Sequence, residues 1–589
     1  MGLEGKSLMA NTKSKSAFRS RLIDFNRNFL DPDTPLSCIG SGEVGGKAEG
    51  LALISNILHE ELSRKPIPDI TVEIPPMAVL CTGAFDAFMQ QNQLYDLAYS
   101  DLPDARIAHA FQKAELPFEV LGDLRSIIEH IYTPLAIRSS SMLEDTKNEP
   151  FAGIYHTKMI PNNEYDPDIR FRQLVEAVKF VYASTYFRGA KGYRRTIGHK
   201  DSDEKMAVII QKLVGKRYQN SFYPEVAGVA RSYNYYPMKP AKPEDGVVNM
   251  ALGLGKTVVD GGISWAYSPA FPKAELPFES VEKMLTGTQL DYWVVNMGEP
   301  PEYDPINEGE YIALENIWTA EEDGSLKYIA STYDQMAGRL TIGTSIKGPR
   351  VLTFAPLLVL KQVAFNDLIK SLLSICEQSL GAPVEIEFAM TFDPPRFGFV
   401  QVRAMVVPSD VIQVSEDELD GENVLISSES VLGNGVVEDI RDVIYIKPEI
   451  FDLKHTKTVV PELEKLNEEM LSKGLPYILI VFGRLGTTDP WLGIPVQWGQ
   501  ICGAKVIVEA TLENVRVELS QGSHYFHNMI NLGVKYFSLP FNRHHKIDWE
   551  WLKNQEAINE TPFIRHVRLE APLKIRVDGR RSRGVIYKT

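Results

Sequence analysis

The sequence predicts a mixed α/β protein in two unequal parts, and three observations lead to this fold class. Up to about residue 405, short apolar runs typical of buried strands alternate with helical stretches. An acidic, weakly apolar stretch at residues 415–422 interrupts the pattern, and a shorter set of strand-like runs follows it. The chain has 589 residues, 44% of them hydrophobic and 24% charged, so it can bury cores of ordinary globular composition.

The first expected elements surround a glycine-rich turn at residues 40–46. A helix is expected from about Lys47, because Leu51 and Ile54 recur on one side at helical spacing. A glycine-rich turn that opens a helix suits a phosphate group, although purely structural turns of this kind are commoner. Further strands are expected at residues 77–81, 135–138, 207–211, 226–230 and 247–250, and a helix at residues 169–182.

Residues 384–405 have the pattern of two strands joined by a turn, which Asp393 and Pro394 mark. A domain boundary is expected near residue 410. Beyond it, strands are expected at residues 424–426, 443–446, 477–482 and 505–508, and a helix at residues 461–471.

These patterns divide the chain into four segments. We expect a flexible N-terminus at residues 1–16, a first domain at residues 17–405, an acidic linker at residues 406–423 and a smaller α/β domain at residues 424–589.

The composition argues against several classes of partner. Lys and Arg number 62 against 77 for Asp and Glu, which gives a net charge of −15 and disfavours general binding to nucleic acid or anionic membranes. The four cysteines are far apart and form no CxxC pair, which fits a reducing compartment. No secretory signal stands at the N-terminus, and no apolar run approaches the ~18 residues of a membrane span. We therefore expect a cytoplasmic protein.

Residues 251–257 match only the end of a nucleotide-binding P-loop. Gly255, Lys256 and Thr257 supply the final Gly-Lys-Thr, but Met250 stands where the motif requires its leading glycine. A Walker-type nucleoside triphosphatase is therefore disfavoured.

A more informative pattern is Leu-Ala-Ile-Arg-Ser-Ser-Ser-Met-Leu-Glu-Asp at residues 135–145, followed by Phe-Ala-Gly at residues 151–153. It resembles the strand and loop of the nucleotide-binding domain in the pyruvate phosphate dikinase and phosphoenolpyruvate synthase family. Further blocks resemble this family in the same order: Gly-Gly-Lys at 45–47, Pro-Pro-Met at 75–77, the apolar strand with Gln211, Ala-Gly-Val at 227–229, Gly-Leu-Gly at 253–255, and Glu-Ile-Glu at 385–387 with Gln-Val-Arg at 401–403.

The resemblance implies an ATP-grasp-like nucleotide-binding module over residues 17–405 that uses ATP and Mg²⁺. Lys47 and Arg138 can neutralise triphosphate oxygens, Arg138 with a bidentate fork and Lys47 as a point charge. Gly153 would let the backbone approach phosphate closely, Thr157 would add a hydroxyl contact, and Gln211 would meet the adenine edge at a hinge. Taken alone, each of these residue types is more often structural or part of a surface pair.

The metal site implied by the resemblance consists of Glu387 and Gln401. Both supply the hard oxygen ligands that Mg²⁺ prefers, and Arg403 beside them would balance phosphate charge. Arg138 and Arg403 are therefore expected to act in catalysis as well as in binding.

The second domain resembles the family's swivelling phosphohistidine domain. Gly-Ser-His at residues 522–524 is followed by Leu-Gly at 532–533, and the spacing from Ser523 to Leu532, 532 − 523 = 9, equals that of the family motif. Gly-Asn-Gly at 433–435 resembles the opening of that domain, and Val-Asp-Gly at 577–579 resembles its close. His524 is thus the expected catalytic nucleophile, because a neutral imidazole is nucleophilic at neutral pH. The alternative is a structural histidine at a helix start.

Some residues depart from the family pattern. Lys256 replaces a glutamate of the Gly-Leu-Gly-Glu segment, Ala404 replaces the proline after Arg403, and bulky residues follow His524. No segment up to residue 589 resembles the family's C-terminal barrel for phosphoenolpyruvate or pyruvate. We therefore expect a separate subunit to supply that barrel, or a different acceptor.

The function implied is an ATP- and Mg²⁺-dependent phosphotransferase of the dikinase type, similar to phosphoenolpyruvate synthase. It would phosphorylate His524 and pass the phosphate to pyruvate or another small molecule. Two alternatives stay open: a nucleotide-binding regulatory protein without turnover, and an ATP-grasp ligase that releases ADP.

Overall fold

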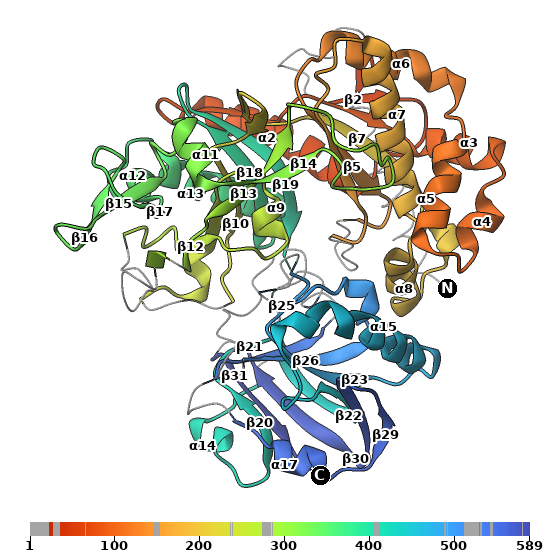
Figure 1. The fold of residues 1–589 in the computed structure, drawn as a ribbon, viewed down its shortest axis with the longest axis vertical. Coiled ribbons are helices and arrows are strands. Elements are labelled where there is room, and N and C mark those ends of the chain that lie inside the picture. The colour runs from red at the N-terminus through yellow and green to blue at the C-terminus, as the bar shows by residue number, and fades with distance from the viewer. Residues whose placement is uncertain are drawn as a thin grey trace, which may run out of the picture.

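The structure is a computed structural model (Figure 1). It describes residues 23–26, 36–64, 66–144, 153–235, 237, 240–273, 284–285, 287–405, 407, 412–487, 491, 493–511, 529, 533–541, 546–579 and 581–588. The expected flexible segment at residues 1–16 lies outside this described part of the chain.

The first sheet is buried on both faces. In its strands, alternate side chains enter different cores: Ala78 and Val208 pack with helices α3, α5, α6 and α7, whereas Val79 and Ile209 pack with α2 and α13. This explains why the strands read as continuous apolar runs in the sequence. The sheet order is β1 (Ile23–Asp24), β2 (Leu36–Ile39), β4 (Met77–Leu80), β7 (Met206–Lys212), β5 (Leu135–Ser141) and β6 (Thr157–Ile160).

Helices cover this sheet because their apolar stripes match its faces. Helix α7 begins two residues before the predicted start, since Asp166 caps it by accepting from Asp168 N and Pro167 suits the first turn. The helices of this region are α2 (Gly46–Arg64), α3 (Thr82–Gln91), α4 (Tyr95–Tyr99), α5 (Asp104–Lys113), α6 (Phe118–His130), α7 (Pro167–Ser184) and α8 (Arg188–Thr196).

The second sheet is largely antiparallel and faces the first across helix α2, which contacts strands of both sheets. Its centre is the predicted hairpin around Asp393 and Pro394. The order is β12 (Trp265–Tyr267), β11 (Val247–Ala251), β10 (Val226–Arg231), β18 (Val384–Thr391), β19 (Arg396–Ala404) and β3 (Thr71–Glu73). Helices α9 (Lys256–Val259) and α13 (Phe365–Leu380) pack against it.

Two smaller sheets flank this region. One contains β14 (Ile312–Asn316), β13 (Asp291–Asn296), β9 (Ser221–Tyr223) and β8 (Lys216–Tyr218), and the other β16 (Arg339–Ile342), β15 (Ala330–Asp334) and β17 (Arg350–Leu352). The short helices here are α11 (Ile317–Glu322) and α12 (Ala355–Leu358).

The C-terminal part has one large mixed sheet of its own, drawn in blue in Figure 1. Strands β22, β23, β26 and β27 are parallel neighbours, so their carboxyl ends share one edge of the sheet. The order is β21 (Val431–Leu432), β27 (Lys535–Leu539), β26 (Ala504–Ala510), β23 (Tyr477–Phe482), β22 (Asn434–Ile446), β30 (Ile564–Asp578), β31 (Arg583–Tyr587), β20 (Val424–Ser428) and β28 (Lys546–Ile547), with β29 (Ala557–Glu560) beside β30. Its helices are α14 (Glu416–Leu419), α15 (Thr456–Ser472) and α17 (Trp549–Lys553).

The structure confirms the predicted mixed α/β class and corrects two local expectations. The end of the expected acidic linker is folded: α14 packs on the C-terminal sheet, where Glu418 pairs with Arg576 and Glu416 with Arg583. Helix α15 begins at Thr456, so Pro461 lies inside it rather than at its start.

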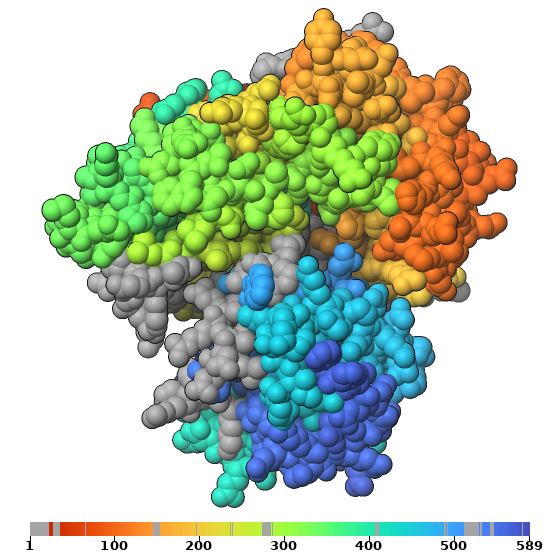
Figure 2. Space-filling view, in the orientation of Figure 1, coloured from red at the N-terminus to blue at the C-terminus, as the bar shows by residue number. Residues whose placement is uncertain are grey.

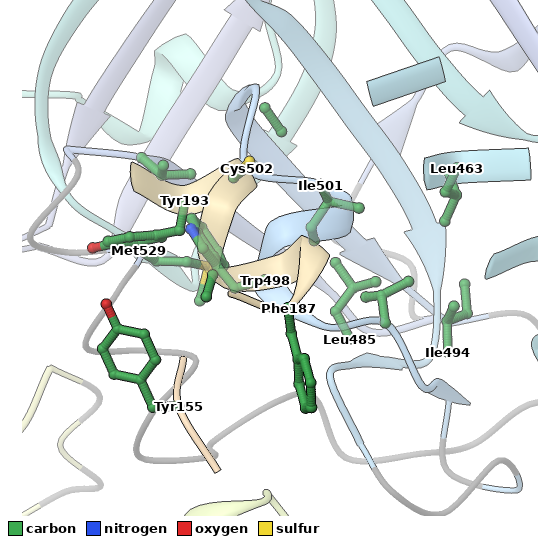
Figure 3. Close-up of a cluster of buried hydrophobic side chains, with 14 of the residues drawn as sticks. Tyr155, Phe187, Tyr193, Leu463, Leu485, Ile494, Trp498, Ile501, Cys502 and Met529 are labelled. Carbon is green, nitrogen blue, oxygen red and sulfur yellow. The ribbon is translucent and has the colours of Figure 1, made fainter. Parts of the chain in front are cut away.

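The C-terminal part docks on helix α8. The turn η4 (Trp498–Gln500) packs against α8, and in Figure 3 Trp498 lies beside Tyr193. The space-filling view shows the two parts in contact along this side (Figure 2). No helix in the described part of the chain is long and apolar enough to cross a membrane.

Candidate functional site

A cavity of about 390 Å³ lies where the two N-terminal sheets and the C-terminal part meet. Strand β5 contributes Arg138, the loop before β6 contributes Gly153, β6 itself contributes Thr157, strand β7 contributes Gln211, and β18 contributes Glu387. The cavity therefore brings together five of the residues that the sequence singled out. Its size is within the range of small-molecule sites.

Arg138 connects the two sheets at the cavity. Its Nη1 donates to Gln211 Oε1 at 3.3 Å and to the Val400 carbonyl at 3.2 Å. Its Nη2 donates to Gln401 Oε1 at 2.7 Å and to Glu387 Oε2 at 3.4 Å. The guanidinium thus spans from strand β7 to strands β18 and β19.

Glu387 and Gln401 are opposite each other in the register of β18 and β19. Cross-strand neighbours project on the same face of a sheet, which brings their side-chain oxygens to one place. Both oxygens meet the same atom, Arg138 Nη2. Glu387 lines the cavity, whereas Gln401 is buried beneath it.

Gln211 is the penultimate residue of β7, an inner strand of the first sheet, and is 3% exposed. Its Oε1 accepts from Arg138, but its Nε2 has no hydrogen-bond partner among the described residues. Leaving a buried amide donor without a hydrogen bond is energetically costly. Because Gln211 lines the cavity, an acceptor on a bound ligand would satisfy this donor.

Lys47 and Arg403, which were predicted to contact phosphate, are not among the residues that line the cavity. Lys47 Nζ donates to Ser139 Oγ at 3.0 Å and to Glu144 Oε1 at 2.7 Å. Arg403 forms a buried pair with Glu385. Both cations are buried and paired with carboxylates, as buried charges require. Arg403 Nη2 also lies 4.0 Å from Oε1 of Glu387, which lines the cavity.

The amino acid sequence alone did not identify a charged cluster on another wall of the cavity. Lys256 Nζ lies 2.5 Å from Asp260 Oδ2, and His156 Nδ1 lies 2.6 Å from Glu308 Oε2. Burial opposes charge on His156, but the Glu308 carboxylate outweighs it and raises the pKa of His156. Burial likewise opposes charge on Glu308, yet His156 and Lys256 hold its pKa well below the usual range. Two features of the sequence could have pointed to this cluster. His156 stands next to Thr157, and Lys256 occupies a position where the family has a glutamate.

A protein-family model described as pyruvate phosphate dikinase, AMP/ATP-binding domain, matches residues 41–423. The chain belongs to this family. The matched range contains all the predicted site residues of the first domain, and the resemblance on which they were chosen is confirmed.

Curated relatives of this dikinase-family chain are distant. An uncharacterized phosphotransferase, YvkC, of Bacillus subtilis is 25% identical over 38% of the chain and 23% of its own length. A probable phosphoenolpyruvate synthase of Archaeoglobus fulgidus is 26% identical over 48% of the chain and 34% of its own length. A phosphoenolpyruvate synthase of Aeropyrum pernix is 25% identical over 38% of the chain and 26% of its own length. The chain therefore spans about a third or less of the relatives it matches.

The donor set of the dikinase-family site is compatible with Mg²⁺. One carboxylate and one amide oxygen, from Glu387 and Gln401, converge at one place, and Mg²⁺ at nucleotide sites commonly takes one or two protein oxygens plus phosphates and water. Among the described residues, no group of three or more His, Cys, Asp or Glu side chains could hold a metal ion. The remaining ligands would thus come from nucleotide and water.

His524 lies outside the residues that the structure describes. Its role as phosphate acceptor therefore stays a prediction.

Proposed function

We propose that this protein is an ATP-dependent phosphotransferase of the dikinase type that phosphorylates its own His524 and passes the phosphate to an acceptor. The observation that carries the proposal is the convergence of Arg138, Gln211, Glu387 and Gln401 at one cavity wall. The family's AMP/ATP-binding domain supports ATP as the nucleotide.

The topology of the C-terminal sheet supports His524 as the acceptor. Strand β26 ends at Ala510, beside Phe482 at the end of β23, and the chain then continues into the segment that contains His524. Leu485, three residues beyond Phe482, lines the cavity. Thr511, the described residue before that segment, therefore follows the same sheet edge as a chain that lines the cavity.

The described residue beyond that segment also supports His524 as the acceptor. Met529 is buried in the apolar core that includes Trp498 and Tyr193, and Figure 3 shows these side chains near one another. Trp498 also lines the cavity. The 17 residues between Thr511 and Met529, 529 − 511 − 1 = 17, include His524. The described residue that follows them thus packs near a residue of the cavity wall.

Each site residue has a distinct proposed role. Arg138 would fork across phosphate oxygens, and Gln211 Nε2 would donate to the adenine edge. Gly153 and Thr157 would contact phosphate from the opposite wall. Phosphoryl transfer needs mainly positioning and charge neutralisation, which this arrangement can provide.

Glu387 and Gln401 would hold Mg²⁺, which when bound neutralises charge on the phosphates. Lys47 would hold Glu144 in place and Arg403 would hold Glu385, and both cations would add positive potential. With Mg²⁺ bound there, the Arg138 guanidinium would have to share or give up its hydrogen bonds to the Glu387 and Gln401 oxygens.

The proposed first step releases AMP. An imidazole nitrogen of His524 forms a bond to the β-phosphorus, and the bond from that phosphorus to the oxygen bridging to the α-phosphate breaks. The electron pair of this bond leaves with AMP, and the pyrophosphoryl group made of the β- and γ-phosphates is transferred to the imidazole. Water then attacks the γ-phosphorus, the bond from that phosphorus to the β–γ bridging oxygen breaks, and inorganic phosphate leaves. The β-phosphoryl group stays on the imidazole until an acceptor takes it. Pyruvate, or another small molecule bound by a partner subunit, is the proposed acceptor.

A labelling experiment tests this proposal. Pure full-length protein is incubated with Mg²⁺ and ATP labelled at either the β- or the γ-phosphate, alongside His524→Ala and the exposed-site control His59→Ala. We expect AMP and acid-labile β-label on the wild type and on His59→Ala, and neither on His524→Ala. Chelation of Mg²⁺ should abolish the label.

Other outcomes would point to other functions. ADP without protein label would favour a ligase. Nucleotide binding without turnover would favour a regulatory protein, a candidate supported by the pairing of Lys47 with Glu144 and of Arg403 with Glu385, none of which lines the cavity.

A further inference from the structure

The nucleotide cavity has a wall that does not come from the nucleotide-binding domain. Residues 485–487 and 496–499 of the C-terminal part line the cavity together with Arg138 and Gln211. They lie between strands β23 and β26, and they are separate from the segment that carries His524. We refer to residues 484–487 and 493–499 as the C-terminal wall.

The C-terminal wall is firmly built into its own domain. Its two short strands, β24 (Arg484–Leu485) and β25 (Gly493–Ile494), pair in parallel, and a Cβ on Gly493 would lie 2.0 Å from the Arg484 carbonyl oxygen. Leu485 N donates at 2.9 Å to Glu509, which also accepts from Tyr536 OH at 2.7 Å. The wall therefore moves with the C-terminal domain as one body.

Two contacts of the wall with the backbone of the nucleotide-binding domain show how closely the two parts meet. Arg484 Nη1 donates at 2.7 Å to the carbonyl of Gly261, in the loop that follows Lys256 and also lines the cavity. Gly499 lies so close to Gly189 of helix α8 that a Cβ on Gly499 would be 2.5 Å from Gly189 Cα. Real Cβ atoms do not approach backbone so closely, so docking in this geometry requires glycine at position 499.

We propose that the C-terminal wall contacts the bound nucleotide, so that nucleotide binding and docking of the C-terminal domain stabilise each other. This inference rests on the proposed ATP site, because it needs a nucleotide in the cavity. A ligand that contacts both domains binds the docked state more tightly than the undocked state. By linkage, the docking must then strengthen nucleotide binding by the same factor.

The test uses the full chain and the non-hydrolysable ATP analogue AMP-PNP with Mg²⁺. Gly499→Ala adds a methyl group whose three nearest atoms all belong to Gly189 of the other domain, so each domain can still fold. Gly122→Ala makes the same change on a helix where the new Cβ meets nothing within 4 Å. Affinity is measured by titration calorimetry, and docking by hydrogen exchange of the α8 backbone.

We expect Gly499→Ala to raise exchange in α8 and to weaken AMP-PNP binding by about 10-fold, within the usual range of coupling between sites. Gly122→Ala should match the wild type. In the wild type, AMP-PNP should slow exchange in α8.

Three results would overturn the inference. Raised exchange with unchanged affinity would mean that the wall does not contact nucleotide. Unchanged exchange in Gly499→Ala would mean that the glycine contact does not govern docking. Absence of AMP-PNP binding to the wild type would remove the proposed ATP site itself, and this inference with it, whereas the first two results leave that site intact.

Discussion

Arg138 connects the two N-terminal sheets at the cavity by hydrogen bonds. Its guanidinium reaches Gln211 on one sheet and Gln401 and Glu387 on the other. A planar fork with five donors can satisfy several acceptors at once, which an ammonium group on a flexible stem cannot do in the same geometry.

Replacing Arg138 with Lys should therefore slow phosphoryl transfer more than it weakens folding. We expect AMP formation to fall by about 100-fold, comparable to the loss of one preorganised charge-stabilising donor. Single-turnover AMP release measures the effect. Arg125→Lys, at a surface arginine paired with Asp168, is the control and should keep the wild-type rate. An equal rate in both variants would exclude Arg138 from the reaction.

Glu204 is a buried carboxyl group beside the cavity loop. Tyr155 OH donates to it, and the backbone of Met142 donates to its other oxygen at 3.2 Å. Burial raises the pKa of Glu204 to about 7, against the lowering effects of Tyr155 and Arg194. Tyr155 itself lines the cavity.

The raised pKa predicts a specific pH dependence of stability. Between the unfolded pKa near 4.5 and the folded value near 7, the folded state binds more protons than the unfolded state, so this group's contribution to the free energy of unfolding falls as pH rises. The loss from pH 5 to pH 8 should be on the order of 2 kcal/mol.

Glu204→Gln should remove this dependence, because the amide stays neutral and can still accept from Tyr155. Urea unfolding at several pH values between 5 and 8 measures the difference between variant and wild type. The control is Glu570→Gln, at an exposed position. A Glu204→Gln profile parallel to that of the wild type would contradict the assignment.

At the scale of elements, the glycine-rich turn before helix α2 is positioned by close packing. Gly45 has a φ of 76°, and a Cβ there would lie 1.7 Å from the Ser140 carbonyl oxygen of strand β5. Ser140 Oγ in turn donates to the carbonyl of Val44 at 2.8 Å. The turn therefore serves to bring α2, and with it Lys47, against β5.

Gly45→Ala and Gly40→Ala make a matched pair that separates packing from backbone strain. Gly40 has a φ of 79°, but the nearest atoms to its Cβ would be 4.0 Å away. We expect Gly40→Ala to destabilise the fold by about 1 kcal/mol through strain alone. Gly45→Ala should cost about 3 kcal/mol or more, because the backbone must also move. Urea unfolding of both variants checks this, and equal losses would show that the close approach carries no energy.

At the scale of the whole molecule, an apolar contact joins the two parts of the chain. Trp498 of the C-terminal part is 5% exposed and packs near Phe187 and Tyr193, as Figure 3 shows. Aromatic residues at the centre of an interface usually contribute most of its binding free energy.

Trp498→Ala should therefore release the C-terminal domain from α8. We expect a larger radius of gyration in small-angle X-ray scattering, since a loss of about 2 kcal/mol or more at one anchor is enough to populate undocked states. Trp318→Ala, at a tryptophan that is 61% exposed on α11, should leave the scattering unchanged. Identical scattering of both variants would mean that other contacts hold the domains together.

The sequence by itself determined the mixed α/β class, the hairpin of β18 and β19, and the cavity residues Arg138, Gln211 and Glu387. These features could be predicted because local periodicity and ordered family motifs are properties of short segments. It did not show that Lys47 and Arg403 are buried in ion pairs, since each pair depends on a carboxylate that folding brings close.

Only the tertiary structure decided which distant segments share the cavity. Arg138 and Gln401 are 263 residues apart in the chain, and Arg484 and Gly261 are 223 apart, yet both pairs are hydrogen-bonded. The C-terminal wall carries no motif, because its role comes from close backbone packing at Gly499 rather than from a reactive side chain. Such contacts are set by how domains dock, and no local pattern encodes them.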